Sequence, residues 1–133
     1  QIREIYDIAA GGKFASGKGN LTTLEIMDDY CDAIVSGVTL NPRPLRVCVD
    51  AGNGMGGVTA VPIYRRLGAV ELKGLFTDPD PQFPNHHPDP TVPENLVHLT
   101  NAVLESKADV GLAFDGDGDR IGVVDDTGRI VWG

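Results

Sequence analysis

Residues 109–131 read DVGLAFDGDGDRIGVVDDTGRIV, and they carry the strongest structural signals of the chain. The first six of these residues form a short apolar run that is typical of a buried strand. The runs IGVVD and RIVW flank the turn-like sequence DDTG at 125–128, which predicts a closing β-hairpin. A buried strand that leads directly into closely spaced acidic residues is typical of the ligand-binding edge of an α/β sheet.

Upstream of this stretch, strand patterns alternate with helix patterns. The segments are the strand LRVCVD (45–50), the glycine loop AGNGMGG (51–57), a helix at about 58–67, the strand AVELKGLF (69–76), a proline-dense loop, and a helix that begins near Pro93. Such an order predicts right-handed crossovers with helices on both faces of a sheet. We therefore expect an α/β fold: a three-layer α/β/α sandwich with a mixed, mostly parallel sheet ending in a β-hairpin.

Residues 1–44 show helical patterns only. One helix is predicted to stop at Gly11–Gly12, and a second is predicted to open at the capping box formed by Thr22 and Glu25. We expect residues 1–44 to be a helical connector from a missing N-terminal domain and residues 45–133 to be a metal-binding α/β/α domain. Because the chain begins with Gln1 rather than Met, we expect it to be part of a longer protein.

Composition limits the classes of partner. The chain has 133 residues, a net charge of −8 and 41% hydrophobic residues, which suits one globular domain. No apolar run approaches the roughly 20 residues of a membrane helix, and the acidic balance disfavours nucleic acid and anionic lipid as partners. Cys31 and Cys48 show no disulfide or metal-ligand spacing, which predicts a reducing, cytoplasmic location.

The motif DGDGDR at 115–120 predicts a metal site. It places Asp115, Asp117 and Asp119 directly after a strand, and Gly116 and Gly118 allow positive φ angles that would make the three carboxylates converge. Converging carboxylates repel one another without a cation, and a set of oxygen ligands suits Mg²⁺. The alternative is a solvated acidic turn without a ligand.

Arg120 follows these aspartates, and its planar guanidinium suits either a carboxylate or a phosphate bound at the metal. It also excludes an EF-hand, because that calcium loop needs glycine at this position and helices, rather than strands, on both sides.

The glycine loop offers a competing function. Gly52, Gly54 and Gly57 spell GxGxxG between a strand and a helix, and Glu71 lies near the distance expected for a ribose contact. A nucleotide-binding module that uses residues 52–57 is therefore the alternative hypothesis. The other interpretation is a tight turn that lets the helix pack closely on the sheet.

Three histidines carry weaker signals. His86 and His87 lie in the proline-dense loop beside Asp80 and Asp89, where we expect hydrogen bonding rather than metal ligation, because their spacing matches no common zinc pattern. His98 lies on a predicted helix and is most simply a surface residue.

Three segments together resemble the phosphohexomutases, the phosphoglucomutase/phosphomannomutase superfamily. They are ADVGLAFDGDGDRIGVVDDTGRIV (108–131), VDAGNGMGG (49–57) and FPNHHPDPTVPENL (83–96). The resemblance runs from about residue 45 to the end, and the preceding helices look like that family's connector. Members have four domains around a central cleft, and this chain resembles the second.

The resemblance implies that Asp115, Asp117 and Asp119 bind Mg²⁺ and that Arg120 lies beside the phosphoryl group. It also implies an isomerase that moves phosphate between C6 and C1 of a hexose through a phosphoserine and a bisphosphorylated sugar. Because the family's phosphoserine belongs to the first domain, no catalytic residue is expected in this chain. A phosphorylated hexose would bind only together with the missing domains, and the isolated chain is expected to be inactive.

Overall fold

The computed structural model of the chain describes residues 1–12, 14–40, 43–68 and 70–133. Its five strands form one mixed sheet with the order β2-β1-β3-β4-β5. Three strands run parallel to one another: β1 (Leu45–Asp50), β2 (Val70–Leu75) and β3 (Val110–Phe114). β4 (Ile121–Asp125) pairs antiparallel with β3, and β5 (Ile130–Val131) pairs antiparallel with β4. The predicted mixed sheet and closing hairpin are confirmed, although residue 69 of the predicted second strand lies outside the described residues.

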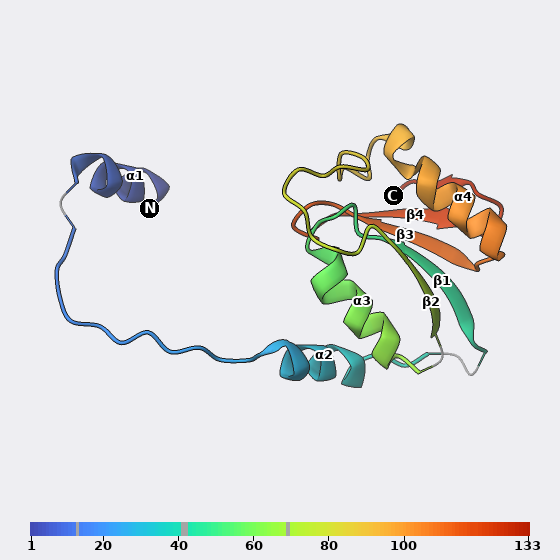
Figure 1. Ribbon diagram of the computed structural model, residues 1–133, viewed down its shortest axis with the longest axis horizontal. Coiled ribbons are helices and arrows are strands. Elements are labelled where there is room, and N and C mark those ends of the chain that lie inside the picture. The colour runs from blue at the N-terminus through green and yellow to red at the C-terminus, as the bar shows by residue number, and fades with distance from the viewer. Residues whose placement is uncertain (13, 41–42, 69) are drawn as a thin grey trace.

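Helices cover both faces of this sheet. α3 (Gly56–Arg66) packs on one face, and α4 (Val97–Ser106), which follows a 3₁₀ turn at Pro93–Leu96, packs on the other (Figure 1). Alternate residues of β1 therefore point into different cores, as the strand pleat requires. Val47 and Val49 contact the α3 side, and Cys48 contacts the α4 side. The predicted three-layer sandwich is confirmed.

The two helices before the sheet differ in their contacts. α1 (Ile2–Gly11) stops at the predicted glycines, and Gly12 adopts a left-handed conformation. The helix buries none of its residues and stands apart from the sheet (Figure 1). α2 (Met27–Ser36) packs on α3 and buries Cys31. The domain boundary at residue 45 stays a prediction. None of the helices in the described part of the chain has the length and apolar character that crossing a bilayer demands.

The start of α2 was predicted wrongly. The capping box at Thr22 and Glu25 lies in irregular chain, and the helix begins only at Met27. A short helical turn is not stable by itself and forms where tertiary contacts support it. Those contacts begin at Asp28, whose carboxylate, together with that of Asp32, binds the Arg66 guanidinium of α3.

The carboxyl ends of β1, β2 and β3 meet at one edge of the sheet, and the loops that follow them contact one another. The backbone N–H of Asn53 donates to Phe76 O after β2, and the N–H of Met55 donates to Gly116 O after β3. The glycine loop thus sits between the proline-dense loop and the acidic loop. This edge brings together nearly all the residues that the sequence marks as functional.

Candidate metal and phosphate site

The three aspartates converge as the sequence predicts. Asp115 follows β3 directly and is only 2% exposed, whereas Asp117 and Asp119 are exposed. One ligand oxygen from each residue lies within 4.8 Å of the others. Within the described ranges, this is the one group of three or more acidic, histidine or cysteine side chains that meets in this way.

The two glycines of the acidic loop have different roles. Gly118 adopts a φ of 82°, which turns the chain back toward Asp115. Gly116 does not adopt a positive φ, so that part of the prediction was wrong. Its backbone instead lies against the glycine loop: a Cβ at Gly54 would stand 2.6 Å from Gly116 O.

Asp115 is held by three donors. Its Oδ1 accepts the backbone N–H groups of Gly118 and Arg120, both at 3.0 Å, and its Oδ2 accepts Nε–H of Arg120 at 2.8 Å. Burial by itself raises the pKa of Asp115, but the backbone N–H and guanidinium of Arg120 lower it more, to about 2. Asp115 is therefore an ionised carboxylate with a fixed orientation at neutral pH.

The closeness of the three carboxylates affects the pKa of Asp119. Its pKa is raised by the adjacent Asp115 carboxylate and by the negative charge of Asp117. A bound cation would relieve this repulsion. Three carboxylate oxygens that leave further positions for water or phosphate fit the coordination of Mg²⁺, so the donor set suits the ion that the sequence predicts.

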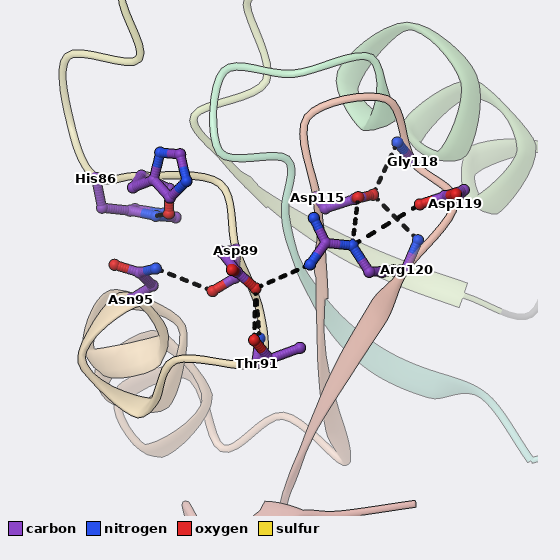
Figure 2. A network of polar contacts seen from close by, with 9 residues as sticks. His86, Asp89, Thr91, Asn95, Asp115, Gly118, Asp119 and Arg120 are labelled. Atoms are coloured by element: carbon purple, nitrogen blue, oxygen red, sulfur yellow. Dashed lines mark hydrogen bonds and ion pairs between the residues drawn. The ribbon is translucent and has the colours of Figure 1, made fainter.

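Arg120 bridges the acidic loop and the proline-dense loop, as Figure 2 shows. Its Nε binds Asp115, its Nη1 lies 3.1 Å from Oδ1 of Asp89, and the side chain is 51% exposed. The distance from Nε to Oδ1 of Asp119 is 3.8 Å. The expected pairing with a carboxylate is confirmed, and contact with a phosphate stays a prediction.

Asp89 is a site residue whose role the sequence did not reveal. Its Oδ1 also accepts the N–H and O–H of Thr91, at 3.0 and 2.7 Å, and these bonds lower its pKa. Asn95 Nδ2 donates to the backbone carbonyl of Asp89, so Asp89 is held at both its main chain and its side chain (Figure 2). The sequence feature that could have indicated this role is the position of Asp89 next to two histidines in a proline-rich loop.

Asp50 and His86 form a second polar contact that the sequence did not predict. Asp50 ends β1 and is fully buried; its carboxylate accepts Gly52 N–H at 2.8 Å and lies 3.1 and 3.2 Å from Nε2 of His86. Burial raises the pKa of Asp50, an effect that His86 and the Gly52 N–H partly offset. The sequence feature that could have indicated this contact is an acidic residue at the end of an otherwise largely apolar strand.

The histidines behave largely as expected. His86 hydrogen-bonds within the loop, since its Nδ1 lies 2.9 Å from His87 O. His98 is exposed on α4, as predicted, yet its ring stacks on that of His86 with centroids 6.2 Å apart, and both rings meet the edge of Phe76.

The glycine loop uses its backbone N–H groups within the protein. Every N–H from residue 51 to residue 55 donates to a protein oxygen: Ala51 to Leu75 O, Gly52 to the Asp50 carboxylate, Asn53 to Phe76 O, Gly54 to Ala51 O and Met55 to Gly116 O. A phosphate cradle needs such groups to point at its ligand. The loop instead holds the edge of the sheet together.

The geometry favours the packing interpretation of this loop over the nucleotide module. A Cβ at Gly57 would stand 1.8 Å from Thr77 O, so close packing requires this glycine. Glu71 pairs in register with Arg46 near the start of β2, at the opposite edge of the sheet from the loop. It is therefore badly placed to contact a ribose at residues 52–57.

Comparison with known proteins gives consistent matches. Residues 28–128 match the family described as phosphoglucomutase/phosphomannomutase, alpha/beta/alpha domain II. A phosphomannomutase/phosphoglucomutase of Pseudomonas putida is 51% identical over 132 residues, covering 99% of this chain and 28% of that protein. A phosphoglucomutase of Neisseria meningitidis is 47% identical over 133 residues, covering 98% of this chain and 28% of that protein.

A solved structure agrees with these sequences. The crystal structure of a phosphoglucomutase/phosphomannomutase family protein from Burkholderia thailandensis superposes with a TM-score of 0.90 and 44% sequence identity, covering 98% of this chain and 28% of that one. The chain thus spans about 28% of the length of these relatives.

Proposed function

The chain belongs to the phosphoglucomutase/phosphomannomutase family as its α/β/α domain II, and from this premise we propose that it is the Mg²⁺-binding domain of a longer phosphohexomutase. The observation that carries the metal assignment is the convergence of the Asp115, Asp117 and Asp119 oxygens within 4.8 Å at the end of β3. The raised pKa of Asp119 supports it, because the cluster concentrates negative charge that a divalent cation would offset.

The longer protein, on this proposal, is an isomerase that interconverts hexose 6-phosphate and hexose 1-phosphate through a phosphoserine and a bisphosphorylated sugar. The phosphoserine and the groups that hold the sugar belong to segments outside this chain, which spans 28% of its relatives. The isolated chain is therefore inactive. The two cysteines are free and buried, which supports a reducing cytoplasmic location.

Each residue of the site has a distinct part in this proposal. Bound Mg²⁺ supplies positive charge that offsets the charge of a transferring phosphoryl group. Asp115, oriented by the backbone N–H groups of Gly118 and Arg120, holds Nε of the Arg120 guanidinium. Arg120 is half exposed at the rim of the acidic loop, where its charge faces an incoming phosphate.

A paramagnetic titration tests the metal assignment directly. Mn²⁺, which takes the same oxygen ligands as Mg²⁺, should broaden the backbone amide signals of residues 115–120 in an NMR spectrum of the chain. Asp117→Asn should abolish this localised broadening while changing the free energy of unfolding by less than about 0.5 kcal/mol, because Asp117 is exposed.

The matched control is Asp126→Asn, which removes an exposed aspartate from the turn between β4 and β5. This variant should bind Mn²⁺ as the wild-type chain does. Broadening spread evenly over the acidic surface, or unaffected by Asp117→Asn, would exclude a specific site. In the full-length protein, Asp117→Asn should remove most of the mutase activity.

A further inference from the structure

The contact between the buried Asp50 and the partly buried His86 has no part in the proposed function, but it restricts the orientation of the His86 ring. Nδ1 of His86 faces the carbonyl oxygen of His87, which only accepts hydrogen bonds, so Nδ1 carries a hydrogen. Nε2 faces the Asp50 carboxyl at 3.1 Å, and this contact is a hydrogen bond only when a second proton lies between the two groups. The pair therefore locks His86 in one ring orientation.

His86 lies on a short segment that crosses the glycine and acidic loops. Pro88, two residues later, is buried, and its Cβ would lie 3.0 Å from a Cβ placed on Gly52. Its Cγ is the nearest atom to a Cβ placed on Gly116, at 3.5 Å. The next residue is Asp89, whose carboxylate reaches Nη1 of Arg120 (Figure 2).

Asp89 draws one side of the Arg120 guanidinium away from the acidic loop. The other side already binds Asp115, and its Nε lies 3.8 Å from Oδ1 of Asp119. Released from Asp89, a mobile guanidinium would find its nearest negative charges in the carboxylate cluster, where it would compete with a metal ion. The placement of Asp89 therefore affects how accessible the cluster is to cations.

We propose that the Asp50–His86 pair is a positioning device: it helps to hold Asp89 in place and thereby keeps the Arg120 guanidinium, which already binds Asp115, from closing over the rest of the cluster formed by Asp115, Asp117 and Asp119. The inference rests on the proposed function only in treating these three carboxylates as a cation site. The positioning of Arg120 itself is a property of the metal-free chain.

The first test is made without metal, by NMR on the ¹⁵N-labelled chain. His86→Gln should shift the Arg120 Nε–H signal and speed its exchange with solvent by at least roughly threefold, because the guanidinium loses a fixed partner. The matched control is His98→Gln, which alters the ring that stacks on His86 but leaves the contact with Asp50 intact. An unchanged Arg120 signal in His86→Gln, or equal changes in the two variants, would overturn the proposal.

A second variant covers the case in which His86→Gln fails to fold. Asp89→Asn leaves the Asp50–His86 pair untouched and removes the negative charge that binds the Arg120 guanidinium. It should reproduce the change in the Arg120 signal. If Arg120 Nε–H behaves in Asp89→Asn as it does in the wild-type chain, Asp89 does not position Arg120 and the proposal is wrong.

The second test is a double-mutant cycle with Mn²⁺ affinity as the readout. His86→Gln should weaken Mn²⁺ binding about 3- to 10-fold in the wild-type chain and have no effect in an Arg120→Gln background. Equal weakening in both backgrounds would show that His86 acts through general packing. A wild-type chain that does not bind Mn²⁺ would refute the proposed metal site, whereas the Arg120 spectra would still decide the positioning role.

Discussion

Two buried aspartates stand at the carboxyl ends of neighbouring parallel strands: Asp50 is the last residue of β1 and Asp115 directly follows β3, and each leads into a glycine-rich loop. Their electrostatics are opposite. Burial raises the pKa of Asp50, whereas the backbone N–H and guanidinium of Arg120 overcome burial and lower the pKa of Asp115 to about 2. The same residue type at the same edge of the sheet thus has its pKa shifted in opposite directions, because the donors around the two carboxyl groups differ in number and charge.

The loops that follow these residues differ in the same way. The glycine loop after Asp50 uses its N–H groups and its lack of side chains to hold three segments together. The acidic loop after Asp115 leaves the Asp117 and Asp119 carboxylates exposed and crowded. The comparison teaches that richness in glycine does not identify a binding loop. Exposed carboxylates that no positive charge in the protein balances are a better indicator of a binding loop.

The largest expected effect tests the structural role of the glycine loop. Gly57→Ala places a Cβ 1.8 Å from Thr77 O, and backbone must move to accommodate it. We expect a loss of about 3 kcal/mol in the free energy of unfolding, measured by urea denaturation. Gly68→Ala is the control, since a Cβ there meets no atom within 4 Å. Equal stability of the two variants would refute the packing role.

A smaller effect concerns how Asp50 and Asp115 make the free energy of unfolding depend on pH. The depressed pKa of Asp115 contributes stability that is present above the ordinary carboxyl pKa and is lost as pH falls through the folded value, between about pH 4 and pH 2. Asp115→Asn should cost roughly 2 kcal/mol at neutral pH and flatten the stability profile over this acid range. The raised pKa of Asp50 acts with the opposite sign, since its contribution is lost as pH rises through the folded value.

The measurement is a set of urea denaturation curves in metal-free buffer, for the wild-type chain and Asp115→Asn. A variant that loses stability on acidification as steeply as the wild-type chain would show that Asp115 is not the group responsible.

The smallest expected effect compares the two loops as binding sites. A dissociation constant on the order of 1 mM for Mg²⁺ implies that about 10 mM Mg²⁺ stabilises the chain by roughly 1.4 kcal/mol. NAD in metal-free buffer should produce no stabilisation, because the N–H groups of residues 51–55 already donate within the protein. Thermal denaturation with each ligand measures both effects. Stabilisation by NAD would favour the nucleotide-binding alternative.

Sequence patterns predicted the elements whose signals are local. The apolar runs at 45–50 and 109–114, the closing hairpin and the stop of α1 at Gly12 all lie where expected. The convergence of Asp115, Asp117 and Asp119 was also predictable, because a turn at Gly118 within five residues is enough to bring them together. The start of α2 was not, because contact with Arg66 of α3, rather than a local cap, supports its first turn.

What the sequence determined by itself is the order of strands and helices, the acidic loop with its preference for a hard cation, and the family resemblance that the comparisons confirm. Only the tertiary structure decided how the remaining polar residues are used. Asp50 meets His86 across 36 positions, and Arg120 meets Asp89 across 31. In this fold these two contacts form because the parallel strands bring their carboxyl ends to one edge of the sheet, so no local pattern encodes them.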